Sequence, residues 1–148
     1  MPVTMQDVRK WLDAEEVDYP AASRLGPEAL PHLQELARSQ DVMLASKATY
    51  LASLIGGELS ARILEAAGVR PEPAIRVAAA TGLKNLKEHD AAPIADRLLG
   101  DGDLGVRKMA VKSLAAFASP AMRIRLQRAA EHDPEPLIRD LATRVLPR

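Results

Sequence analysis

The chain has 148 residues, with 20 Lys and Arg balanced by 20 Asp and Glu, and it contains no Cys. The absence of Cys excludes disulfides, thiolate metal ligands and a thiol nucleophile. A net charge of zero disfavours nonspecific nucleic-acid binding. Because 47% of the residues are hydrophobic and only 3% are aromatic, the core must be aliphatic, which favours closely packed helices.

The length fits one ordinary domain, and we expect a single domain over residues 1–148. No apolar run reaches the roughly 20 residues that a membrane-spanning helix needs. The N-terminal stretch "MPVTMQDVRKW" also lacks the basic start and the apolar segment of a signal peptide. The expected location is therefore cytoplasmic, with no membrane as a partner.

Residues 1–26 are expected to form a degenerate N-terminal capping unit, which a stack of repeats needs because its outermost repeat has no neighbour to cover it. Thr4 and Asp7 have the spacing of a capping box at a helix start. Val8, Trp11 and Leu12 then give that helix a single apolar stripe. The stretch "LGP" interrupts the chain before the next segment.

Residues 27–148 contain three full copies and one partial copy of one pattern, in which an acid is followed by an apolar residue, then by Ala and Leu at helical spacing. In the partial first copy the Leu is displaced to Leu51. The pattern is clearest in "DLGVRKMAVKSL", residues 103–114, and the copies are separated by 31, 31 and 32 residues. The acids that begin the copies are Asp41, Glu72, Asp103 and Glu135. The alanines that share one position are Ala48, Ala79, Ala110 and Ala142. Each acid is expected to cap a helix, and each Ala to mark a close helix contact.

An apolar segment with helical spacing and a turn precede each of these helices, so each copy contains two helices. Three arginines, Arg76, Arg107 and Arg139, follow the initial acid by four residues, while Ala45 takes this position in the first copy. Residues four apart face each other on a helix. Each of these arginines is therefore expected to pair with the acid one turn earlier.

The segments "DLGVRKMAVKSL" and "EPAIRVAAATGL" resemble HEAT repeats, and they are close to the short bacterial type found in bilin-lyase-like proteins. The resemblance covers roughly residues 27–148. It implies an all-α fold, a right-handed α-solenoid of about four to five antiparallel helix pairs, with the second helices lining a concave face. It also implies a scaffold or binding role. Armadillo repeats are the near alternative, although they usually have a third helix.

The Asp-Gly-Asp at residues 101–103 could open a calcium loop or could separate two helices. A calcium loop requires a bidentate carboxylate at its twelfth position, which here is Lys112. An ammonium group at that position repels the ion. We therefore interpret Asp103 as a helix cap.

The three histidines are weak candidates for a metal site. The tripeptide "EHD" occurs around His89 and around His132, and carboxylates beside imidazole are metal-ligand types. The repeat register places these two histidines on opposite edges of a solenoid, so they cannot converge. His32 is expected on the surface of a first helix. No metal and no cofactor is predicted.

Catalytic motifs are also missing, and we expect that the protein is not an enzyme. Deoxyhypusine hydroxylases with HEAT-like repeats bind iron through His-Glu dipeptides, and this chain has none. HEAT-like DNA glycosylases need aromatic side chains, and one Trp, two Tyr and one Phe are a thin supply. The sequence lacks a "GxSxG" motif and a phosphate-binding glycine loop.

With no metal or catalytic motif, the candidate functional surface is the outward face of the second helices. The candidate partner-binding residues on this face are Tyr50, Thr81, Lys84, Lys108, Lys112 and Arg144. They could form a solvated helix surface, or they could steer an acidic protein or peptide into the groove. The predicted function is a non-catalytic scaffold or adaptor for a protein partner. The alternative is a bilin-lyase-like accessory factor or a HEAT-like nucleic-acid-binding protein.

Overall fold

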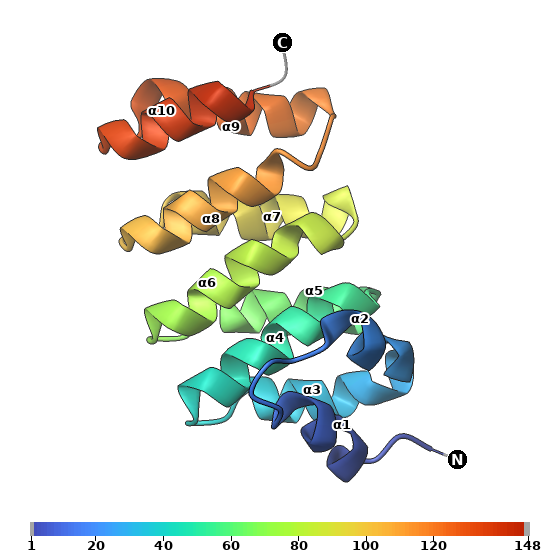
Figure 1. Ribbon diagram of the computed structural model, residues 1–148. Helices are drawn as coiled ribbons and strands as arrows, with labels where there is room; N and C mark the ends of the chain where they lie inside the picture. Colours follow the sequence, from blue (N-terminus) through green and yellow to red (C-terminus); the bar gives the residue numbers. More distant parts are fainter. Residues whose placement is uncertain (1, 147–148) are drawn as a thin grey trace.

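The computed structural model describes residues 2–146, which form helices and turns and contain no β-strand. An N-terminal unit consists of α1 (Met5–Leu12), α2 (Tyr19–Ala22) and a short 3-10 helix. Four helix pairs follow and stack in one row (Figure 1). The pairs are α3 (Leu30–Ala37) with α4 (Val42–Ile55), α5 (Glu58–Ala67) with α6 (Pro73–Gly82), α7 (Glu88–Leu99) with α8 (Leu104–Leu114), and α9 (Pro120–His132) with α10 (Pro136–Val145).

The second helices, α4, α6, α8 and α10, form one layer in which each contacts the next, and the first helices, α3, α5, α7 and α9, form the other layer. The predicted α-solenoid is therefore confirmed. Between Pro2 and Leu146, no helix is long and apolar enough to cross a membrane.

Aliphatic and small side chains fill the space between the layers. The alanines of the predicted contact position, Ala48, Ala79, Ala110 and Ala142, are fully buried. The apolar residues that precede them by four positions, Leu44, Ile75, Val106 and Ile138, are buried as well. Gly82 shows how closely neighbouring helices approach, because a Cβ atom placed on it would lie 2.7 Å from Cβ of Ser53.

Buried hydroxyl groups connect neighbouring helices. Ser60 on α5 donates a hydrogen bond to the carbonyl oxygen of Ala52 on α4, at 2.6 Å. Ser113 on α8 donates in the same way to the carbonyl oxygen of Ala80 on α6. A buried hydroxyl is costly without a partner, so these bonds restrict how one helix can slide along the next.

All four predicted acids occupy the N-cap position of a second helix. Asp41 and Asp103 accept hydrogen bonds from backbone N–H groups at 3.1 and 3.0 Å. The side chains of Glu72 and Glu135 accept none from their helices, and each of these residues is followed by Pro. Capping by the carboxylate is therefore confirmed for the two aspartates and wrong for the two glutamates, whose side chains are one carbon longer.

The N-terminal unit begins with the predicted capping box. The backbone N–H of Asp7 donates to the Thr4 hydroxyl at 3.1 Å, and the backbone N–H of Thr4 donates to the Asp7 carboxylate at 2.9 Å. Val8 and Leu12 are buried, but Trp11 is 36% exposed. The predicted apolar stripe is therefore confirmed at Val8 and Leu12, which are four residues apart and buried, and wrong at Trp11.

The N-terminal unit lies over α3 and α4 (Figure 1). Lys47 on α4 donates to the carbonyl oxygens of Leu12 and Ala14 at 3.2 and 3.3 Å. The imidazole Nε2 of His32 lies 2.9 Å from the carbonyl oxygen of Val3. His32 is therefore partly buried and holds the N-terminal segment, in contrast to the predicted surface position.

Candidate functional site

Arginines of the second helices form ion pairs with the following repeat. Arg76 on α6 contacts Asp101, in the turn after α7, with Nε at 2.9 Å and Nη2 at 3.2 Å from the two carboxylate oxygens. Arg107 on α8 contacts Asp133, in the turn after α9, at 3.1 and 3.4 Å. The predicted pairing with an acid one turn earlier on the same helix is therefore wrong. In the third repeat that acid, Asp103, caps its helix instead.

These aspartates also shape their turns. One carboxylate oxygen of Asp101 accepts the backbone N–H of Asp103, and one of Asp133 accepts that of Glu135, both at 2.9 Å. Burial acts to raise the pKa of Asp101, but the hydrogen bonds from Arg76 and the Asp103 backbone outweigh it and lower the pKa. In the Asp-Gly-Asp motif, Asp103 is the helix cap and Asp101 connects two repeats.

The first repeat uses the opposite arrangement. Ala45 stands where later repeats have Arg, and Arg70 stands where later repeats have Asp101 and Asp133. Arg70 reaches back and donates to the carbonyl oxygens of Ala37 and Ser39 at 2.9 and 3.0 Å. It also pairs with Glu72 at 2.9 Å, and its hydrogen bond lowers the pKa of that carboxyl group.

The candidate partner-binding residues have two kinds of environment. The Tyr50 ring is covered by Tyr19 of the N-terminal unit, at a centroid distance of 5.0 Å, and the Thr81 hydroxyl donates to its own helix at Val77. The four basic residues, Lys84, Lys108, Lys112 and Arg144, are exposed and form no ion pair within residues 2–146. The open part of the second-helix face is thus basic.

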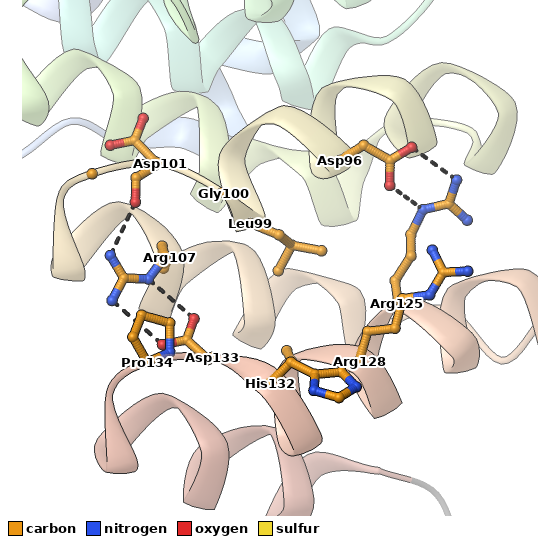
Figure 2. Close-up of a pocket in the computed structure, with 12 residues that line it drawn as sticks. Asp96, Leu99, Gly100, Asp101, Arg107, Arg125, Arg128, His132, Asp133 and Pro134 are labelled. Atoms are coloured by element: carbon orange, nitrogen blue, oxygen red, sulfur yellow. Dashed lines mark hydrogen bonds and ion pairs between the residues drawn. The ribbon is translucent and has the colours of Figure 1, made fainter.

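A cavity of about 560 Å³, which the sequence did not reveal, lies between α7 and α9 (Figure 2). Leu99 lies between two Arg–Asp pairs, Arg107 with Asp133 on one side and Arg125 with Asp96 on the other. The second pair measures 2.7 Å, and its hydrogen bond raises the pKa of Arg125.

Two further basic side chains, Arg128 and His132, and the small residue Ala129 also line this cavity. Arg128 makes no hydrogen bond or ion pair with any residue that the structure describes. His132 lies at the C-terminal end of α9, whereas His89 lies in the first turn of α7. Their side chains are both highly exposed, and residues 2–146 contain no group of three or more potential metal ligands.

Repeated helix pairs with buried contacts only between neighbours define the class of α-helical repeat proteins. Within this class, residues 60–147 match the HEAT-repeat family, and the chain belongs to that family. No curated protein matches the sequence.

Solved structures with a similar fold include two proteins of known name. One is "the complex of CpcE and CpcF of phycocyanin lyase from Nostoc sp. PCC7120", with a TM-score of 0.71 and 17% identity over 96% of this chain and 99% of the other. The second is human deoxyhypusine hydroxylase, with a TM-score of 0.68 and 21% identity over 99% of this chain and 62% of the other. At these identities, the similarity establishes the fold.

Proposed function

We propose that this protein is a non-catalytic scaffold that binds a partner protein on the second-helix face, the outward surface of α6, of the 3-10 helix Leu83–Asn85 that follows it, of α8 and of α10. The observation that carries the proposal is a row of exposed basic side chains on this surface that form no ion pair with any residue from 2 to 146, namely Lys84, Lys108, Lys112 and Arg144. Because Tyr50 is covered by Tyr19 and the Thr81 hydroxyl bonds to its own helix, these four residues are the ones that we expect to contact the partner.

Two of these basic side chains lie close together on α8. Lys108 and Lys112 are one turn apart, both are exposed, and neither has an acid at three or four residues' distance along its helix. Like charges at this spacing destabilise a helix by a few tenths of a kcal/mol. A carboxylate on a partner would relieve the repulsion, and the added fields of the row would accelerate association with an acidic surface.

Two arginines of the first helices, in contrast, form ion pairs. On the first-helix side, Arg62 pairs with Glu58 and Arg125 pairs with Asp96, each at 2.7 Å. These pairs neutralise two cations of the first helices, although Arg97 and Arg128, also on first helices, form no ion pair within residues 2–146. On the second-helix face, none of the four exposed basic side chains forms an ion pair with a described residue. A binding role would account for four exposed basic side chains that share this face without a counter-ion among the described residues.

The test is a pair of charge reversals compared with the wild-type chain. Lys108→Glu with Lys112→Glu changes the second-helix face, and Lys87→Glu with Arg97→Glu changes exposed, unpaired residues of the third repeat outside that face. Each protein is immobilised and exposed to host lysate. We expect the wild-type and control variants to retain the same proteins and the second-helix variant to lose them.

The association rate with a purified retained protein then provides the second measurement. Reversal on α8 should lower this rate by at least tenfold and flatten its salt dependence, because steering charges act mainly on association. The urea midpoint of all three proteins should agree, since exposed substitutions usually change stability by less than about 0.5 kcal/mol. Partner loss from the control variant alone would refute the assigned surface, and salt-sensitive retention of nucleic acid would support the alternative function.

A second candidate function is that of an accessory subunit in a two-protein assembly. It is favoured by the likeness to the complex of CpcE and CpcF, which covers 96% of this chain and 99% of the matching chain. This candidate predicts one retained protein in a fixed 1:1 ratio, measurable by light scattering during size-exclusion chromatography. Several retained partners without fixed stoichiometry would contradict it.

A further inference from the structure

The junctions between successive first helices contain cavities of very different size. The volume is about 40 Å³ between α3 and α5, about 100 Å³ between α5 and α7, and about 560 Å³ between α7 and α9. The first and third cavities occupy equivalent places in the repeat. Gln34, Ala37 and Arg38 line the small cavity, and Asp96, Leu99 and Gly100, each 62 residues later, line the large one.

The difference in volume follows from two substitutions between equivalent positions. At the first junction, Arg70 extends across the gap to the carbonyl oxygens of Ala37 and Ser39. At the third junction the equivalent residue is Asp133, which is shorter and is held by Arg107. Gly100 likewise replaces Arg38 and removes a long side chain. The third junction has therefore lost the side chains that close the first.

Among the described residues around the large cavity, one arginine has no counter-ion. Each carboxylate in the lining is paired, Asp96 with Arg125, Asp133 with Arg107, and Asp101 with Arg76. Arg128 has no such partner within residues 2–146, and the His132 imidazole, 3.6 Å from Glu131, lies beside it on α9 (Figure 2). Leu99 and Ala129 are partly buried and offer an apolar surface between the ion pairs.

We propose that this cavity binds a small organic anion, in which a carboxylate or phosphate group contacts Arg128 and a compact apolar body lies against Leu99 and Ala129. The volume of about 560 Å³ falls within the ~300–1,000 Å³ of small-molecule sites. The two Arg–Asp pairs are already satisfied, so they provide fixed walls, and His132 can donate a further hydrogen bond. The site is separate from the second-helix face, and its test is independent of the proposed function.

The probe is 8-anilinonaphthalene-1-sulfonate, a fluorescent anion with an apolar body, titrated into the folded chain. We expect saturable binding at one site. Arg128→Ala should raise the dissociation constant at least tenfold, because a hydrogen bond between two charged groups is lost. Arg97→Ala, an exposed arginine at the smaller α5–α7 cavity, should leave it unchanged. No binding, or equal binding to Arg128→Ala, would overturn the proposal.

Two further measurements locate the ligand and define its charge. Ala129→Phe should fill the cavity and abolish binding, and its thermal midpoint verifies that the variant folds. If it does not fold, Arg128→Ala still tests the proposal, because Arg128 is exposed and its removal should not disturb the fold. 1-Naphthoate and 1-naphthyl phosphate should displace the probe, and the stronger competitor identifies the preferred anion. Equal displacement by 1-naphthylmethylammonium, which has the same body and the opposite charge, would show that the cavity does not select anions.

Discussion

Replacing Arg107 by Met tests whether the ion pair between repeats stabilises the fold. The side chains of Arg107 and Asp133 are only 10% and 5% exposed, so the substitution leaves a buried carboxylate without its counter-ion. Removing one partner of a buried pair typically costs about 3–5 kcal/mol. The bond from Arg107 to the carbonyl oxygen of Asp101 is lost as well. We expect a loss of about 3 kcal/mol, which for a chain of this size lowers the thermal midpoint by about 6–12 °C.

Urea denaturation and calorimetry measure this loss, and the last repeat offers a matched control. Arg139 occupies the same position but is less buried, and its described bond is to the carbonyl oxygen of Asp133 at 2.7 Å. Arg139→Met should therefore cost about 1 kcal/mol. The double variant Arg107→Met with Asp133→Asn should recover part of the loss, because no buried charge remains. Equal costs for Arg107→Met and Arg139→Met would refute the assigned role of the pair.

Two other predictions concern a close contact and a titrating group. Gly82→Ala should lower the free energy of unfolding, measured by urea denaturation, by about 1–3 kcal/mol, because the added Cβ would lie 2.7 Å from Cβ of Ser53. The control is Gly102→Ala, whose added Cβ would have no neighbouring atom within 4 Å and should not destabilise the chain. Equal effects of the two variants would contradict the close contact. The pKa of Asp101 is lowered from 3.8 in the folded chain, so its contribution is present above pH 3.8 and is lost as the pH falls through the lowered value. The stability cost of Asp101→Asn should therefore be constant near neutral pH and shrink below pH 3.8; a cost that grows on acidification would contradict the sign.

The helix pairs were predictable from the sequence because their causes are local or periodic. A small residue recurs wherever two helices approach closely, and Ala48 and Ala110 are fully buried as this spacing predicts. The acids at the starts of the second helices were predictable for the same reason. The prediction of a side-chain cap failed at Glu72, where the length of the side chain and the following Pro decide whether the carboxylate bonds to the helix.

Contacts between repeats were harder to predict. Arg76 is four residues from Glu72 and 25 residues from Asp101, so a local argument favours the nearer acid. In the folded chain, stacking brings the turn of the next repeat to the guanidinium group, and two hydrogen bonds to one carboxylate form. A bidentate pair has better geometry than a pair on one helix face. The sequence signal was the Asp shared by positions 101 and 133.

Residues at equivalent positions of the repeats also explain why the junction between α7 and α9 is open while the junction between α3 and α5 is closed. Arg76 and Arg107 are each followed in the next repeat by a turn that carries Asp, whereas Ala45 is followed by a turn that carries Arg70. In both arrangements an arginine reaches a neighbouring turn, but its side chain occupies a different place. Arg70 extends into the space beside α3, whereas the shorter Asp133, held by Arg107, only lines the space beside α7. Equal stacking is thus compatible with a cavity of about 40 Å³ or about 560 Å³. Specific sites in such a fold can therefore arise from exchanges between equivalent positions, without any change in the helices themselves.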